Sequence, residues 1–247
     1  GVNLTNSLKL TSWLNLDVGV YLKYGKEKNG SYDLFAPGFN AMPYDLLVND
    51  DGSYFVAPSQ ISKARRDLIE QYGLYSEDLV PMDELNYALN QVKSMETRAY
   101  AKLKVDFTSW LNYDVMFQYE TNDTNYESLN EKETLYMRKR INDFTSESPW
   151  GGGYLDYNLP DGDSFYTLSN KKSSYNFRQQ LNFNETFAEK HNVVWILGQE
   201  IRHSLICFDE NTFYGYDPKL KSWQNFNVLD LSYFSGILGA AQLAQSN

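Results

Sequence analysis

The chain has 247 residues, a formal net charge of −10 at pH 7 and a pI near 4.7. This acidity argues against nucleic-acid binding, which uses a basic surface, and the single cysteine, Cys207, rules out a disulfide within this sequence. Aromatic residues make up 16% of the chain. Together with many Asn, Asp, Ser and Gly residues, which favour turns, they predict an all-β protein with generous loops.

Hydropathy gives no sign of a membrane-spanning helix. The longest apolar stretches, such as Val193–Gly198, are far shorter than the roughly 20 residues that such a helix needs. The mean hydropathy of −0.54 is nevertheless compatible with membrane strands, because only every second residue of such a strand faces lipid.

The first expected element is a β-hairpin over residues 2–24, with strands near 2–10 and 14–24. Apolar and polar residues alternate along its second strand, and a period of two places one set on each face. The apolar set is Leu14, Leu16, Val18, Val20 and Leu22. The segment Thr11–Asn15, with the sequence Thr-Ser-Trp-Leu-Asn, forms the link between the strands.

Residues 25–96 are expected to form a long loop. Within it, residues 59–72 have apolar residues at helical spacing, with Ser59 as a cap before Ile61, and predict a short helix. Asp50-Asp51-Gly52 predicts a tight turn.

A second hairpin is expected over residues 97–121, because the pentapeptide recurs 97 residues later as Thr108–Asn112. The alternation predicts that Val105, Leu111, Val115 and Phe117 share one face. The opposite face is predicted to carry Lys104, Asn112, Asp114 and Gln118.

The following segment, 122–172, is expected to be a second long loop. Its Trp150-Gly151-Gly152-Gly153-Tyr154 stretch suits sugar stacking by aromatic rings, although a glycine-rich loop tip is the simpler interpretation. Trp150, Tyr154 and Tyr157 are the candidate substrate contacts. Asp161-Gly162-Asp163 lacks the downstream glutamate of a calcium loop and is interpreted as a turn.

The third expected hairpin covers residues 173–203, with a turn around Glu185 to His191, and residues 204–247 form the last expected loop. Short turns that alternate with loops of about 70 and about 50 residues are typical of outer-membrane β-barrels. Strands of about 11 residues also match the apolar band of such barrels. A soluble β-sandwich has the same alternation and stays the competing architecture. In a barrel, Trp13 and Trp110 would lie in the aromatic girdle at the periplasmic membrane interface.

The residues contain no recognisable catalytic machinery. His191 and His203 are the only histidines, and neither lies in a metal-spaced motif. There is no nucleophile elbow and no phosphate-binding glycine loop. We therefore expect no enzyme activity, no cofactor and no metal.

Several stretches resemble the SusC/RagA family of TonB-dependent outer-membrane proteins of Bacteroidetes. They are the strand–Thr-Ser-Trp-Leu–strand unit at 8–20 and 105–117, Met42–Val48 with Asp50–Gly52 and Asp83–Tyr87, Leu135–Thr145, Leu181–Asn192 continuing to Leu197–Ile201, and Tyr214–Pro218.

This resemblance implies an antiparallel meander that forms part of an outer-membrane barrel of about 22 strands around a plug, with long extracellular loops. It also implies import of oligosaccharides or peptides with a SusD-like lipoprotein, energised by TonB–ExbB–ExbD through a plug region. We find no plug segment in these residues, so the chain is expected to be an internal part of a longer outer-membrane protein. The alternative is a soluble β-rich carbohydrate-binding module of a secreted protein.

Overall fold

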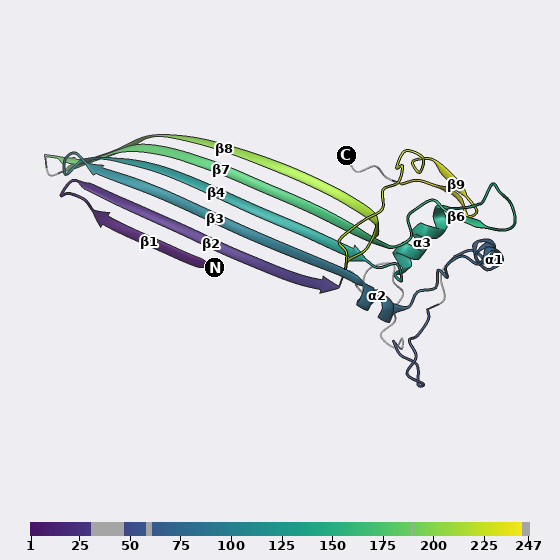
Figure 1. The fold of residues 1–247 in the computed structure, drawn as a ribbon. Helices are drawn as coiled ribbons and strands as arrows, with labels where there is room; N and C mark the ends of the chain where they lie inside the picture. The colour runs from purple at the N-terminus through teal and green to yellow at the C-terminus, as the bar shows by residue number, and fades with distance from the viewer. Residues whose placement is uncertain (31–46, 58–60, 189, 244–247) are drawn as a thin grey trace. The chain divides into compact units, whose positions relative to one another are not determined.

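The computed structural model describes residues 1–30, 47–57, 61–188 and 190–243. Its main feature is a six-stranded sheet whose strand order is β1-β2-β3-β4-β7-β8 (Figure 1). These strands are Val2–Lys9, Leu14–Gly30, Ala88–Asp106, Leu111–Asn130, Asp163–Phe187 and His191–Tyr216. Neighbours in the sheet follow one another along the chain, so the all-β class and the antiparallel meander predicted from the sequence are confirmed.

Contacts divide the chain into two compact units. Unit 1 consists of Gly1–Lys26, Val92–Asn125 and Ser169–Asp209, and unit 2 of Glu27–Gln91, Tyr126–Leu168 and Glu210–Asn247. The three short hairpin turns belong to unit 1, whereas the long connections belong to unit 2.

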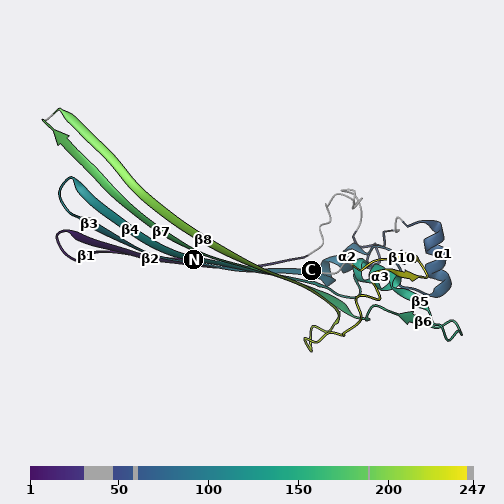
Figure 2. The ribbon, with the colours of Figure 1, turned by 90° about the horizontal axis from the view of Figure 1, so that it is seen from above.

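The first two hairpin turns of unit 1 have the same hydrogen bonds. Leu10 N–H donates to the Leu14 carbonyl at 2.9 Å, and Phe107 N–H donates to the Leu111 carbonyl at 3.0 Å. In each turn, the tryptophan N–H also donates to the hydroxyl of the threonine two residues before it, at 3.4 Å. The repeated pentapeptide therefore encodes a repeated turn. All three hairpin turns of unit 1 lie at the same end of its strands (Figures 1 and 2).

The pairing of β1 with β2 keeps the apolar residues of both strands on one face. Leu4 lies opposite Val20, and Leu8 lies opposite Leu16. Directly paired residues share a face of the sheet, so these four side chains lie on the same side. A slip of one residue would move this apolar set to the other face.

Unit 2 contains three helices with recognisable ends. Helix α1, Lys63–Tyr72, is capped by the Ser62 hydroxyl and ends at Gly73, whose φ of 65° is accessible to glycine at little cost. Helix α2, Pro81–Tyr87, starts with a proline, which needs no N–H partner at this position. Helix α3, Leu135–Asp143, is capped by the buried hydroxyl of Thr134.

The hydrophobic core of unit 2 forms around helix α3. It consists of Met137, Ile141, Phe144, Leu159, Tyr214, Leu231 and Leu243. Two small hairpins complete the unit: β5, Thr145–Glu147, pairs with β6, Leu155–Tyr157, and β9, Phe234–Gly236, pairs with β10, Gly239–Ala241. Segments expected to be loops therefore form a packed unit.

A buried ionic network joins α1 to α3 within unit 2. Arg65 donates to both carboxylate oxygens of Glu77, at 2.8 and 2.6 Å, and to Asp143 at 2.7 Å. The side-chain amide of Asn142 donates to the Tyr75 carbonyl and to Glu77. The Glu77 side chain has no exposed surface.

The strands and the first helix differ in extent from the prediction. Strand β4 runs to Asn130, and β7 already begins at Asp163, so both enter the segment expected to be a loop over 122–172. Likewise, β2 continues to Gly30, β3 starts at Ala88 and β8 reaches Tyr216. The third turn is shorter than expected, because β7 ends at Phe187. Helix α1 starts after Ser62, so the predicted cap at Ser59 is wrong for the described helix.

Residues 42–46 of the Met42–Val48 stretch, and Ser59 itself, lie outside the described residues. The turn predicted at Asp50–Gly52 is present: Gly52 has a φ of 84° and donates to the Asn49 carbonyl. No helix in the described part of the chain is both long and apolar enough to cross a membrane.

Candidate functional site

Unit 1 has an apolar face that no described residue of the unit covers. Every buried hydrophobic residue of the described chain belongs to unit 2, whereas many large apolar side chains of unit 1 are exposed. Leu4 is 65% exposed and Leu197 is 67% exposed. We call this set the apolar face: Leu4, Leu8, Val20, Leu22, Phe117, Tyr119, Trp195, Leu197, Ile201 and Leu205. A sheet that buries none of these residues has no hydrophobic core of its own.

Three polar side chains on the apolar face bond to one another. The Tyr113 hydroxyl donates to Gln179 at 2.6 Å, and the Gln179 amide donates to Gln199 at 2.9 Å. Aromatic rings next to them also stack, with Phe183 and Trp195 at a centroid distance of 5.3 Å. Mutual hydrogen bonding removes the main cost of placing such groups in an apolar medium.

The opposite face of unit 1, the polar face, is a network of charged and amide side chains. Arg98 lies 3.0 Å from Glu120, and Lys102 lies 3.5 Å from Asp114. The Asn182 amide connects two strands by donating to Asn112 at 2.7 Å and to Asp114 at 3.0 Å. At the sheet edge, β8 departs from this pattern, because Val194, Ile196, Ile206 and Phe208 have the parity of the polar face and are exposed.

A glycine and a tyrosine fit together on the polar face. A Cβ atom at Gly19 would lie 2.3 Å from the Tyr100 ring, which is shorter than any normal contact. The missing side chain therefore lets the Tyr100 ring lie directly over the backbone of β2. This pair fixes how β2 and β3 approach each other within unit 1.

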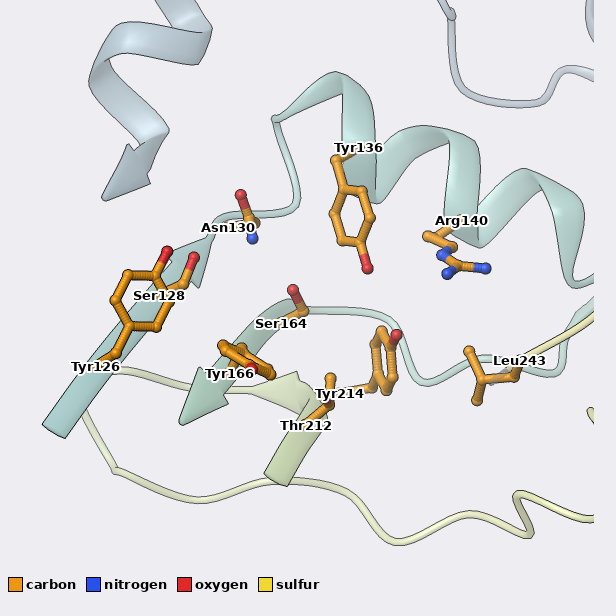
Figure 3. Close-up of a pocket in the computed structure, with 10 residues that line it drawn as sticks. All are labelled: Tyr126, Ser128, Asn130, Tyr136, Arg140, Ser164, Tyr166, Thr212, Tyr214 and Leu243. Atoms are coloured by element: carbon orange, nitrogen blue, oxygen red, sulfur yellow. The ribbon is translucent and has the colours of Figure 1, made fainter. Parts of the chain in front are cut away.

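Unit 2 contains a pocket of about 320 Å³ between α3 and three strands (Figure 3). We call it the tyrosine pocket. Its lining consists of Tyr126, Ser128, Asn130, Tyr136, Arg140, Ser164, Tyr166, Thr212, Tyr214 and Leu243. Figure 3 shows Tyr136 and Arg140 pointing from the helix toward Ser164 and Tyr214 on the strands. Tyr136 and Arg140 share a face of α3 because they are four residues apart.

Electrostatics in the tyrosine pocket favour a fixed cation beside neutral phenols. Burial raises the pKa of the Tyr214 hydroxyl, and Tyr136 adds to this shift, so the Tyr214 hydroxyl stays protonated at neutral pH. Burial alone would lower the pKa of Arg140. The hydrogen bond with Tyr136 and the electrostatic influence of Tyr136, Tyr214 and Asp143 outweigh burial and raise that pKa. The Arg140 guanidinium also lies 5.7 Å from the centroid of the Tyr136 ring.

The substrate contacts predicted from the sequence lie in a different part of unit 2. Trp150 is 93% exposed and Tyr154 is 72% exposed, at the tip of the β5–β6 hairpin. Three glycines with positive φ, 151–153, separate them, which supports the glycine-rich loop tip. Tyr157 ends β6 and packs against Tyr75 at a ring distance of 6.4 Å. None of these three predicted contacts lines the tyrosine pocket.

The two predicted girdle residues occupy equivalent places in unit 1. Trp13 and Trp110 each precede a strand and are partly exposed, at 51% and 37%. The carbonyl of each accepts a hydrogen bond from a strand residue, Asp106 for Trp13 and Asn184 for Trp110. Trp110 also makes an edge-to-face contact with Phe183 at 5.3 Å.

The other polar residues considered in the sequence analysis make contacts that stabilise the fold. Asp163 accepts a hydrogen bond from the Lys132 N–H at 3.0 Å and is the first residue of β7, and Gly162 next to it has a φ of 142°, which favours glycine. His203 stacks on Tyr175 at 5.2 Å. Among the described residues, no three His, Cys, Asp or Glu side chains gather where they could hold a metal ion.

Sequence reasoning missed the tyrosine pocket altogether. Its lining comes from four elements and a C-terminal segment that are distant in the sequence, so no short motif marks it. One signal was available: Tyr136 and Arg140 share a helical face within Leu135–Thr145, a stretch that also carried the family resemblance.

No protein-family model matches this sequence, and no curated protein matches it.

Proposed function

We propose that this chain is a segment of the wall of an outer-membrane transporter of the SusC/RagA type. Such a transporter imports oligosaccharides or peptides together with a SusD-like lipoprotein. TonB–ExbB–ExbD supplies the energy through a plug region outside this sequence. The cell outer membrane is the corresponding location, and outer-membrane lipid is the corresponding neighbour of the apolar face.

The observation that carries the proposal is the apolar face of unit 1. Strands in a soluble domain bury such a face against a second layer, because exposed apolar patches of this extent are rare in soluble monomers. In a membrane barrel the same face contacts lipid, and the opposite face lines a polar interior. The hydrogen-bonded network of Arg98, Lys102, Asp114, Glu120 and Asn182 suits that interior.

Two further features support the same proposal. The trio of Tyr113, Gln179 and Gln199 pairs its polar groups within the apolar face, as an apolar medium requires. Short connections in unit 1 and long connections that form unit 2 match the turns and loops of outer-membrane barrels. Six strands cannot close a barrel of about 22, so the proposed role is that of a segment.

Site-directed spin labelling tests the proposal on adjacent residues of β4. In a Cys207→Ser background, the single variants Phe117→Cys, Gln118→Cys, Tyr119→Cys and Glu120→Cys are labelled and placed in membranes. We expect labels at 117 and 119 to collide mainly with oxygen, which dissolves in lipid. Labels at 118 and 120 should collide mainly with a water-soluble nickel chelate.

Residues 118 and 120 act as matched controls, because they lie on the same strand and differ only in the face they occupy. If the nickel chelate reaches all four positions equally, the apolar face is not in lipid. That result would favour the alternative, a soluble β-rich carbohydrate-binding module, in which another protein layer must cover this face.

A further inference from the structure

The tyrosine pocket of unit 2 contains one formal charge. Of the ten residues that line it in the described part of the chain, only Arg140 is charged at neutral pH. The other lining groups are phenols, hydroxyls, one amide and one aliphatic side chain, Leu243. A ligand that fills this space therefore meets a single cation among neutral hydrogen-bonding groups.

The Arg140 guanidinium has no carboxylate partner among the described residues. The Asp143 carboxylate contributes to the raised pKa of Arg140, but it pairs with Arg65 at 2.7 Å. The contacts of Arg140 are with Tyr136 and, at 3.4 Å, the Gln242 carbonyl. The remaining guanidinium donors are left for an anion, and a carboxylate matches the spacing of two parallel N–H groups.

The neutral lining suits a sugar better than a peptide. Hydroxyl groups of Ser128, Ser164 and Thr212 both donate and accept hydrogen bonds, as sugar hydroxyls do. The rings of Tyr126 and Tyr166 lie at a centroid distance of 5.9 Å and offer aromatic surface to the C–H face of a sugar ring. Leu243 is the single aliphatic residue of the lining, so apolar peptide side chains would find little complementary surface.

Glu210 is a carboxylate close to this lining but is not part of it. It accepts a hydrogen bond from the Tyr166 hydroxyl at 3.0 Å. The volume of about 320 Å³ lies at the small end of the range for small-molecule sites. The space is therefore suited to one or two sugar units.

We propose that the tyrosine pocket binds an acidic sugar, a uronate, whose carboxylate pairs with Arg140. The inference rests on the proposed function, because it names the class of nutrient, a uronate-bearing glycan, that such a transporter would take. The proposal requires a negative charge on the ligand. The exposed Trp150 and Tyr154 have no positive charge that could select for it.

The test compares acidic and neutral sugars on the whole 247-residue chain in detergent. The probes are the methyl glycosides of glucuronate and galacturonate, and the controls are methyl glucoside and methyl galactoside, which lack the carboxylate. Dissociation constants come from ligand-observed NMR titrations. We expect at least one uronide to bind about tenfold or more tightly than its neutral partner, as for a charge-assisted hydrogen bond.

Variants then assign the preference to Arg140. Arg140→Gln should remove it, whereas Lys139→Gln makes the same charge change on the same helix outside the lining and should leave it intact. Thermal melts report whether each variant folds. If Arg140→Gln does not fold, Arg140→Lys decides: it keeps the cation but loses the planar pair of donors, and should weaken uronide binding while leaving neutral sugars unaffected.

Several results would overturn the inference. They are equal affinity for acidic and neutral sugars, no binding of any of them, an unchanged preference in the Arg140 variants, and tighter binding of a triglutamate peptide than of the uronides. The failure of this proposal differs from that of the transporter proposal, because the spin labels report on unit 1 and the titrations on unit 2.

Discussion

The buried carboxylate of Glu77 should be among the most sensitive positions of unit 2. Its side chain is fully buried and accepts three hydrogen bonds, two from Arg65 and one from Asn142. The Arg65–Glu77 hydrogen bond is the main cause that raises the pKa of the Arg65 guanidinium. Glu77→Gln keeps the shape of the side chain but places an N–H₂ group against the donors of Arg65.

Removing one partner of a buried ion pair costs about 3–5 kcal/mol. Arg65 keeps Asp143 as a partner and is 26% exposed, so we expect the lower end, about 3 kcal/mol. The matched control is Asp67→Asn, which breaks the exposed Lys63–Asp67 pair on α1 and should cost less than about 0.5 kcal/mol.

The free energy of unfolding is measured by urea titration at constant detergent. Hydrogen exchange of the α1 and α3 amides then locates the loss within unit 2. The reasoning is refuted if Glu77→Gln costs no more than Asp67→Asn, or if exchange in α1 and α3 stays at the level of the unsubstituted chain.

Three further substitutions follow from the structure. Gly19→Ala places a Cβ against the Tyr100 ring and should lower the stability of unit 1 by about 1–3 kcal/mol in thermal melts; an unchanged melting temperature would contradict this packing. Thr134→Ala removes the buried cap of α3 and should lower the free energy of unfolding by about 1–2 kcal/mol in urea titrations. Thr134→Ser keeps the capping hydroxyl and should retain most of that stability, so equal losses in the two variants would argue against a capping role. Burial raises the pKa of Glu84 from its ordinary value of 4.5, although the Leu135 N–H opposes the shift. The folded chain therefore binds this proton more tightly than the unfolded chain, so stability should fall as the pH rises from about 4.5 through the raised pKa. Melting temperatures from pH 4.5 upward should fall less steeply for Glu84→Gln, and equal slopes would contradict the assignment.

The sequence predicts unit 1 well because its signal is local. Alternation along β2 and β4 marks the two faces, and the repeat of Thr11–Asn15 at Thr108–Asn112 marks two turns with the same hydrogen bonds. The strand ends were harder to predict. Asn122, Asp123 and Asn125 have low strand propensity, yet they belong to β4, because pairing with neighbouring strands outweighs local preference.

The sequence predicts loops for most of unit 2, because the stabilising contacts of this unit are remote in the sequence. The network of Arg65, Glu77 and Asp143 joins residues up to 78 positions apart in the sequence, and no local pattern predicts it. The same holds for the tyrosine pocket, where Arg140 meets residues of three strands. The sequence instead points to exposed aromatic residues such as Trp150. A glycine-rich loop tip can be recognised from a short stretch of sequence, whereas a pocket formed by distant segments cannot.

Fluorescence quenching by brominated lipids tests most directly whether the apolar face of unit 1 lies against acyl chains. Variants that keep a single tryptophan, either Trp195 on the apolar face or Trp150 in unit 2, are reconstituted into vesicles with bromine on the acyl chains. The account predicts strong quenching of Trp195 and no quenching of Trp150, which iodide in the water should quench instead. Variants that keep only Trp13 or Trp110 should respond most to bromines near the headgroups. Equal quenching of Trp195 and Trp150, or a Trp195 that responds only to iodide, would contradict the account.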